Sequence, residues 1–253
     1  MSLLIARRGI LAAGATAAPP SGDYAAEVAA DSPFAWWRME ETAGSTATDE
    51  QGNHNGTVTG ANLDVSGAPG TGSAVSFDGT DDYIDVGTLG NFGSLLGSGC
   101  SVEAWVKWTA TTAHMAVMGQ VDAGTSNFMQ LRVNAGAEGR VQFAYRVAGG
   151  DRRGRDTDGV GYNDGEWHHV VATWSAAGEF PDLYIDGALD NGATSQGISG
   201  TSTGDFVQPL TIGARNNVGT LDSHYEGAAD EPALYDKVLT PTRIGVHHTA
   251  GAS

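Results

Sequence analysis

Hydrophobic and polar residues alternate along much of the chain with the period of two that is typical of half-buried β-strands. The pattern is clearest in residues 129–134 and 142–147, where every second residue is apolar. Residues 135–139 between them contain two glycines and predict a hairpin loop. Further strands are predicted at 34–39, 75–77, 84–86, 102–108, 167–175, 183–186, 210–214 and 228–235. Many short strands without a long helix predict an all-β fold, an antiparallel jelly-roll β-sandwich.

Helical signals are confined to the two ends of this pattern. Residues 23–30 follow a Pro-Pro-Ser-Gly break and predict one short helical turn. A second turn is predicted to begin at Thr240-Pro241, because proline is favoured in the first turn of a helix. We therefore expect an N-terminal arm and linker at residues 1–32 and a single domain at residues 33–250.

The arm itself admits two interpretations. Arg7 and Arg8 precede a weakly apolar stretch, residues 9–18, which includes Ala-Thr-Ala at 15–17. This order is typical of a secretory or twin-arginine signal that is removed on export. The alternative, which we favour, is a retained arm that anchors the protein to other proteins of an assembly.

Composition and charge narrow the classes of partner. Acidic residues outnumber basic ones by 30 to 13, which gives a formal net charge of −17. Such a chain repels a phosphate backbone, so nucleic acid is not expected as a partner. No apolar run approaches the roughly 18 residues of a membrane-spanning helix, so no membrane span is expected. Cys100 is the only cysteine, which excludes an intrachain disulfide, and we expect its thiol to be buried.

Several short motifs, in their order along residues 33–250, resemble the laminin-G-like domain of the concanavalin A-like lectin and glucanase superfamily. They are AWWRMEE at 35–41, VSFDG at 75–79, SVEAWVK at 101–107, WHHVVA at 167–172, LYIDG at 183–187, LTIG at 210–213 and DE at 230–231. The resemblance implies a concanavalin A-like jelly roll. It constrains function less, because lectins, adhesion domains, glucanases and phage tail or virion proteins share this fold.

Two functions are therefore carried forward, and both lie outside the cytoplasm. The first is a non-catalytic binding or adhesion module that recognises glycans or a cell-surface polysaccharide, in an extracellular or cell-surface location. The alternative is a virion structural protein, in a tail or as a capsid decoration, that contacts only protein neighbours. A glycoside hydrolase is disfavoured, because enzymes of this superfamily carry two carboxylates in an E-x-D-x-x-E pattern that is missing from the sequence. Glu103 has only Trp105 and Lys107 on its own face of the strand, so we predict no catalytic residues and no enzyme.

Calcium is the one cofactor for which the sequence offers ligands. The resemblance implies a structural calcium site between the two ends of the domain, for which Asp49, Asn53 and Asp230 are the candidates. The alternative is that the two aspartates cap turns, and both interpretations stay open. Asp78, Asp81 and Asp82 form a second acidic cluster, for which a role in the turn is expected.

The candidate ligand-binding residues are Gln130, Arg132, Gln142 and Arg146, which alternate with the apolar positions of the predicted hairpin. They should share one exposed face of the sheet. Amide and guanidinium groups there can hydrogen-bond sugar hydroxyls or an acidic glycan. The alternative is an ordinary solvated face, or one covered by protein.

Tryptophan is the other residue type suited to sugars, because its ring can stack on a pyranose. Trp37, Trp105, Trp167 and Trp174 fall within strand motifs and are expected in the core. Trp36 and Trp108 lie near strand ends, so the sequence assigns them less clearly to the core than the other four.

Overall fold

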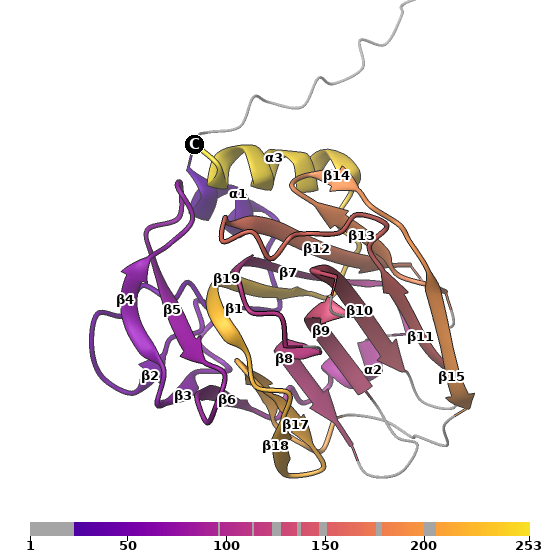
Figure 1. Cartoon of the computed structure of the whole chain (residues 1–253), viewed down its shortest axis with the longest axis horizontal. Coiled ribbons are helices and arrows are strands. Elements are labelled where there is room, and N and C mark those ends of the chain that lie inside the picture. Colours follow the sequence, from indigo (N-terminus) through magenta and orange to yellow (C-terminus); the bar gives the residue numbers. More distant parts are fainter. Residues whose placement is uncertain are drawn as a thin grey trace, which may run out of the picture.

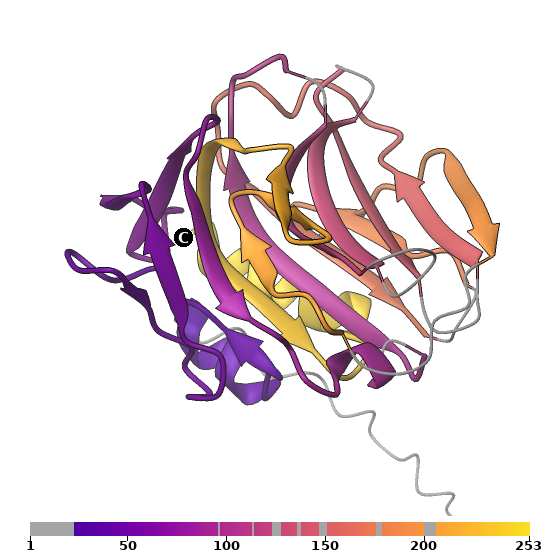
Figure 2. The same cartoon turned by 90° about the horizontal axis from the view of Figure 1, so that it is seen from below.

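The computed structural model describes residues 23–95, 97–112, 114–122, 128–135, 138–146, 151–175, 179–199 and 206–253. The arm or signal predicted at residues 1–20 lies outside these ranges, as does part of the predicted hairpin loop at 135–139. The described residues form two large sheets that pack face to face, with helices on one side (Figures 1 and 2).

The first sheet has eight strands. In order across the sheet these are β14 (Ala188–Leu189), β13 (Asp182–Ile185), β12 (His168–Trp174), β7 (Cys100–Lys107), β19 (Glu226–Tyr235), β5 (Ser73–Asp78) and β4 (Asn62–Ser66), with β1 (Ala35–Trp36) paired to β19. All of its pairs are antiparallel. β1 and β19, which lie far apart in the sequence, pair in the middle of this sheet.

The second sheet has eleven strands. In order these are β15 (Thr194–Ser199), β11 (Asp151–Asp156), β10 (Arg140–Arg146), β9 (Phe128–Ala135), β8 (Met115–Val121), β16 (Leu210–Ile212), β6 (Tyr83–Gly87), β3 (Gly56–Thr59) and β2 (Thr46–Ala47), with β17 (Arg215–Asn217) beside β8 and β18 (Thr220–Asp222) beside β17. Its pairs are antiparallel except for β17 and β8. The predicted all-β antiparallel sandwich of the concanavalin A-like kind is confirmed.

The main core lies between the two sheets and consists of the apolar positions of the alternating strands. Phe143 and Tyr145 of β10 stack on Trp174 of β12, with ring centroids 5.1 and 4.7 Å apart. These contacts join the sheets, since β10 and β12 belong to different ones. Cys100 is fully buried, as predicted, and burial raises the pKa of its thiol to about 12.

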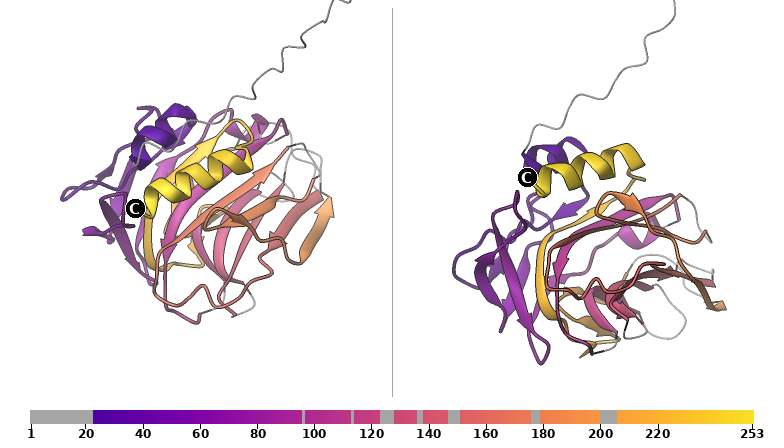
Figure 3. Two further views of the ribbon diagram at one scale, coloured as in Figure 1. Left: turned by 90° about the horizontal axis from the view of Figure 1, so that it is seen from above. Right: turned by 45° about the horizontal axis from the view of Figure 1, so that its top comes forward.

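The helices α1 (Tyr24–Ala30) and α3 (Pro241–Gly251) lie together over the outer face of the eight-stranded sheet, and a short helix, α2 (Phe92–Leu95), precedes β7 (Figure 3). Asp23 and Thr240 cap the two longer helices through their side-chain oxygens. Tyr24 and Val28 of α1 and Ile244 of α3 belong to a second apolar cluster with residues of that sheet. α3 is longer than the single predicted turn, because this packing stabilises more than the sequence propensity alone indicates. None of the helices in the described residues has the length and apolarity to cross a membrane.

The strand predicted at residues 34–39 is shorter than its alternation suggests. β1 contains only Ala35 and Trp36, and Trp37 makes an isolated bridge to Asp49. Met39 has a φ of 61°, in the left-handed region, which turns the chain out of the sheet. Its side chain is nevertheless fully buried, and burial in the core offsets the local backbone cost.

Candidate functional site

The outer face of the eleven-stranded sheet carries the polar side chains that the sequence pointed to. The β9–β10 register pairs Arg132 with Gln142 and Phe128 with Arg146, and Gln130 lies two residues before Arg132. Opposed residues in an antiparallel pair point to the same face. The register therefore places Gln130, Arg132, Gln142 and Arg146 on one face, and turns the apolar residues between them toward the core.

Two neighbouring strands, β11 and β17, add charged residues to this face. Asp156 of β11 is paired with Gln142, and Arg152 lies on the same side of β11. Arg215 of β17 lies beside β8. We call the resulting surface the arginine face; its members are Phe128, Gln130, Arg132, Gln142, Arg146, Arg152, Asp156, Ser195, Arg215 and Asp222.

A side-chain amide connects the middle of the arginine face. Gln142 Oε1 accepts hydrogen bonds from Arg132 Nε at 2.6 Å, from Arg132 Nη2, and from Arg152 Nη2 at 3.1 Å. Its Nε2 donates to Asp156 Oδ1, and Arg152 Nη1 donates to Ser195 Oγ at 3.0 Å. Two guanidinium groups therefore converge on one neutral oxygen and not on a carboxylate.

The positive charge on the arginine face is incompletely compensated. Arg215 forms a bidentate ion pair with Asp222, with both N···O distances 2.7 Å. In the part of the chain that the structure describes, Arg132, Arg146 and Arg152 form no such pair. Burial, reinforced by the charge of Arg152, lowers the pKa of the Arg132 guanidinium to about 10.

Gln130 is buried beneath the other side chains of this face, and its amide group makes no hydrogen bond to the described residues. It is 1% exposed, and neither its Oε1 nor its Nε2 has a partner among the described residues. Gln142 is only 5% exposed, so the predicted exposure of these two residues is wrong. The reason is that side chains from the flanking strands pack over them: a Cβ on Gly119 would lie 3.2 Å from Arg215 Cγ and 3.3 Å from Gln130 Cγ. An unpaired buried amide costs about 1–3 kcal/mol, which a ligand can recover.

The sequence pattern missed Arg152, Asp156 and Arg215. The alternation of Arg152, Gly154 and Asp156 was an available signal, but residues 151–156 contain no apolar residue to mark a strand. Arg215 comes from a three-residue strand whose position beside β8 depends on the parallel pairing. Without the strand pairing, neither Arg152 nor Arg215 could be assigned to a face of the sheet.

Asp49 occupies the kind of position expected of a turn cap. Its Oδ1 accepts hydrogen bonds from the backbone N–H of Trp36 and Gln51, at 2.9 and 3.0 Å. Its Oδ2 accepts from the backbone N–H of Asn53 and His54, both at 3.0 Å. Four amide donors satisfy this carboxylate, which leaves no lone pair directed to an ion. The side chain of Asn53 donates to Gln51 O at 3.1 Å.

Asp230 is fully buried in a different setting. Its Oδ2 accepts from Ala68 N at 3.1 Å and from the Thr71 hydroxyl, whereas its Oδ1 has no partner in the described part of the chain. Burial raises the pKa of Asp230 to about 7. The hydrogen-bond partners of Asp49 and Asp230 have no residue in common. Among the described residues, no printed contact brings Asp49, Asn53 and Asp230 together, and calcium binding at these three residues stays a prediction.

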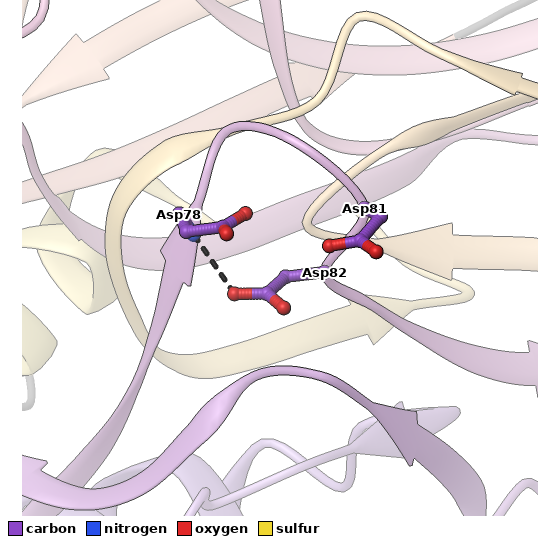
Figure 4. Close-up of side chains that lie close together, drawn as sticks. All are labelled: Asp78, Asp81 and Asp82. Carbon is purple, nitrogen blue, oxygen red and sulfur yellow. Dashed lines mark hydrogen bonds between the residues drawn. The ribbon is translucent and has the colours of Figure 1, made fainter.

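The three aspartates Asp78, Asp81 and Asp82 do come together, in the turn between β5 and β6 (Figure 4). One carboxylate oxygen from each lies within 4.8 Å of the others. Asp82 Oδ2 accepts from Asp78 N at 2.9 Å, and Asp78 Oδ1 accepts from Thr80 N at 2.8 Å. These hydrogen bonds give two of the three carboxylates the turn role that was expected.

Trp36 and Trp108, the two tryptophans near strand ends, do not offer an exposed ring on which a sugar can stack. Trp36 is 4% exposed, and its Nε1 donates to Glu231 at 2.5 Å. Trp108 is 2% exposed and belongs to the main core, at the wall of a cleft of about 280 Å³ that also involves Lys107 and Glu226. Trp167 was expected in the core but is only partly buried, at the edge of the second apolar cluster.

Glu103 does not stand alone on its strand, contrary to the sequence interpretation. It is fully buried and contacts Tyr24 of α1 and His247 of α3. Its oxygens accept from the hydroxyls of Tyr24 and Tyr235 at 3.0 and 2.6 Å, and contact His169 Nε2 at 2.6 Å and His247 Nδ1 at 3.0 Å. We call these five residues the Glu103 network.

The network extends to the rim of the helices. His247 Nε2 lies 3.0 Å from Asp31 Oδ2, which accepts from Arg243 Nε at 2.7 Å. The two carboxylates, Glu103 first, raise the pKa of His247 to about 10 against the effect of its burial. His247, in turn, lowers the pKa of Glu103 well below its usual range. Each charge in the network thus has a partner, so the network fixes α1 and α3 to the sheet.

Comparisons with known proteins agree with this architecture. A sequence profile described as the concanavalin A-like lectin/glucanases superfamily, of the laminin G type, matches residues 78–245. An 87-residue segment is 31% identical to part of the mouse (Mus musculus) protein "Sushi, von Willebrand factor type A, EGF and pentraxin domain-containing protein 1". That segment covers 32% of the chain and 2% of the mouse protein.

Two solved structures illustrate the fold. Domain 4 of AbnA, a GH43 extracellular arabinanase from Geobacillus stearothermophilus in complex with arabinotriose, is 20% identical with a TM-score of 0.58, over 85% of this chain and 98% of that one. The Trypanosoma rangeli sialidase in complex with 2,3-difluorosialic acid is 14% identical with a TM-score of 0.57, over 85% of this chain and 32% of that one. At these identities the likeness shows the fold alone.

The prediction that the chain is not an enzyme, which was based on the missing glucanase motif, is wrong. Several structures of the Trypanosoma rangeli sialidase match the chain. Enzymes therefore contain domains of this architecture, and a missing glucanase motif does not exclude catalysis. The chain covers 32% of the sialidase, so the match assigns neither an activity nor its absence.

Proposed function

Because the chain belongs to the concanavalin A-like lectin/glucanases superfamily, we propose that it binds carbohydrate on the arginine face. The observation that carries this proposal is Gln130, which is buried beneath that face and whose two amide atoms have no partner among the described residues. Native proteins rarely leave both atoms of a buried amide without a partner, so Gln130 is a candidate contact for a ligand on this polar face.

The side chains around Gln130 are of the types that recognise sugars. Arginine donates several hydrogen bonds in a fixed planar arrangement, and glutamine both donates and accepts, as sugar hydroxyls do. The half-buried Arg132 and Arg152 are held by Gln142, so their positions are set before a ligand arrives. Domain 4 of the arabinanase, a structure of the same fold, was solved with an oligosaccharide.

This function places the protein outside the cytoplasm, in an extracellular or cell-surface location. Glycans and surface polysaccharides are its partners there. The extracellular arabinanase that contains a domain of this fold is consistent with such a location.

The test is a glycan screen followed by calorimetric titration of the strongest ligand. We expect binding that is lost in Arg132→Ala and Gln142→Ala, because both side chains face the proposed ligand. Arg38→Ala is the control, since Arg38 pairs with Glu231 away from β9 and β10. Binding that survives both substitutions on the arginine face would place the site elsewhere.

The alternative is a virion or assembly protein, attached to its neighbours through residues 1–32. It predicts that no glycan in the screen binds. It also predicts that the protein no longer attaches to its neighbours in the assembly when residues 1–20 are deleted. A screen without a single ligand would therefore favour this alternative over carbohydrate binding.

A further inference from the structure

The charges on the arginine face point to the chemical class of its ligand, and we propose that this face selects saccharides that carry a carboxylate. The inference rests on the proposed function, because it assumes that the ligand is a carbohydrate. It adds the anionic group, which neither the fold nor the family specifies.

The first step is the contrast between this face and the rest of the chain. The whole protein has a formal charge of −17. Among the described residues of the arginine face there are four arginines (Arg132, Arg146, Arg152 and Arg215) and two aspartates (Asp156 and Asp222). A locally positive surface on an acidic protein concentrates an anionic ligand at that surface and repels it elsewhere.

The second step is the state of the guanidinium groups. Arg132 and Arg152 share Gln142 Oε1. Burial lowers the pKa of Arg152 and the charge of Arg146 lowers it further, whereas the nearby Asp156 only partly opposes them. Like charges held together at partly buried positions repel each other. An anion placed among them relieves that repulsion, whereas a neutral sugar does not.

The third step is the match of shape. A guanidinium group presents two parallel N–H donors to the two oxygens of a carboxylate, and such charge-assisted pairs are stronger than neutral hydrogen bonds. Arg146 Nε is buried and has no partner among the described residues. Arg152 also lies over the ring of Phe128, with its Cζ 5.7 Å from the centroid, which orients the guanidinium plane. Gln130 is then available for a hydroxyl of the same sugar.

The experiment compares acidic probes with their neutral counterparts by isothermal titration calorimetry. The pairs are oligogalacturonate with its methyl ester and sialyllactose with lactose. Two further probes are a carrageenan oligosaccharide, which carries sulfates but no carboxylate, and polyglutamate, which carries carboxylates but no sugar. We expect at least one carboxylated sugar to bind roughly tenfold to hundredfold more tightly than its neutral counterpart, which is the range of one to two charge-assisted hydrogen bonds. Its affinity should fall as NaCl is raised from 50 to 300 mM.

Matched variants locate the effect. Arg132→Gln and Arg152→Gln should each remove most of the preference for the acidic sugar, whereas Arg152→Lys should retain part of it. The control is Arg153→Gln: Arg153 is the next residue on β11 but lies over Phe180 on the other side of the strand. Melting curves confirm folding, and if a glutamine variant does not fold, Arg152→Lys and the salt dependence of the wild type decide.

The outcomes separate this inference from the function on which it rests. If acidic and neutral sugars bind equally and both are lost in Arg132→Gln, carbohydrate binding stands and the selection for carboxylates is wrong. If no sugar binds, both fail. Preference for the carrageenan oligosaccharide over both carboxylated sugars, or binding of polyglutamate as tight as that of any sugar, also overturns the inference.

Discussion

The outer faces of the two sheets both carry ionisable side chains, but they use them in opposite ways. On the eight-stranded sheet, Glu103 is covered by α1 and α3 and receives hydrogen bonds from four side chains. On the eleven-stranded sheet, Arg132, Arg146 and Arg152 have no carboxylate partner among the described residues. The charges of the Glu103 network are paired with one another, although Trp105 Nε1 and His169 Nδ1 have no partner among the described residues. The second face instead keeps arginines that form no ion pair.

The difference shows how one fold separates stability from recognition. A buried charge is tolerated when its partners are buried with it, and such a group contributes to the attachment of the elements that supply the partners. A polar group without a partner destabilises the free protein and is relieved by a ligand. The pairing of charges, rather than the number of polar groups without a partner, therefore distinguishes the two faces.

The largest effect is expected from Glu103→Ala. This substitution removes the buried carboxylate that His169, Tyr24 and Tyr235 share, and it leaves Asp31 as the remaining anionic partner of His247. Removing one partner of a buried pair typically costs about 3–5 kcal/mol. In thermal unfolding we expect the melting temperature to fall by roughly ten degrees. We also expect α1 and α3 to detach from the sheet before the sandwich unfolds. A loss below about 1 kcal/mol would show that the Glu103 network does not hold the helices.

The next effect concerns alkaline pH. The folded-state pKa of His247 is raised to about 10 from the ordinary 6.5, so its contribution to stability is complete below pH 6.5 and is lost as the pH rises toward 10. We expect the free energy of unfolding to decrease between pH 7 and 9.5. The variant His247→Gln should be less stable at pH 7 but should lack this part of the pH dependence. Parallel pH profiles for the two proteins would contradict the assignment.

The next prediction concerns calcium at Asp230, whose buried Oδ1 has no partner among the described residues. If calcium binds there, adding it should raise the melting temperature, because a ligand held only by the native state stabilises that state. Asp230→Ala should abolish the response, whereas Asp49→Ala should lower stability by about 1–2 kcal/mol with and without calcium, as the loss of a cap does. An unchanged melting temperature on addition of EDTA to the wild type would end the calcium prediction.

The smallest effect on stability is expected on the arginine face. Arg152→Gln removes one of several mutually repelling charges, so the free energy of unfolding should change by no more than about 0.5 kcal/mol and in either direction. Urea titration of this variant beside Glu103→Ala measures the contrast between the two faces directly. A loss comparable to that of Glu103→Ala would mean that both faces are structural.

Some of these features were determined by the sequence itself. The alternation in residues 129–134 and 142–147 placed Gln130, Arg132, Gln142 and Arg146 together, because the period of two fixes which residues of a strand share a face. The motifs along residues 33–250 fixed the superfamily. Asp23 and Thr240 marked the helix starts through capping chemistry that acts within four residues.

Only the tertiary structure decided which polar groups are paired. His247 lies 144 residues from Glu103 and Asp31 lies 216 residues from His247, so the network depends on α1 and α3 docking on the same sheet. Arg152 and Arg215 join the arginine face through strand pairings that are set by the closure of the whole sandwich. Local patterns fix the direction of a side chain along its own strand, but partners are chosen by long-range packing, which no short segment contains.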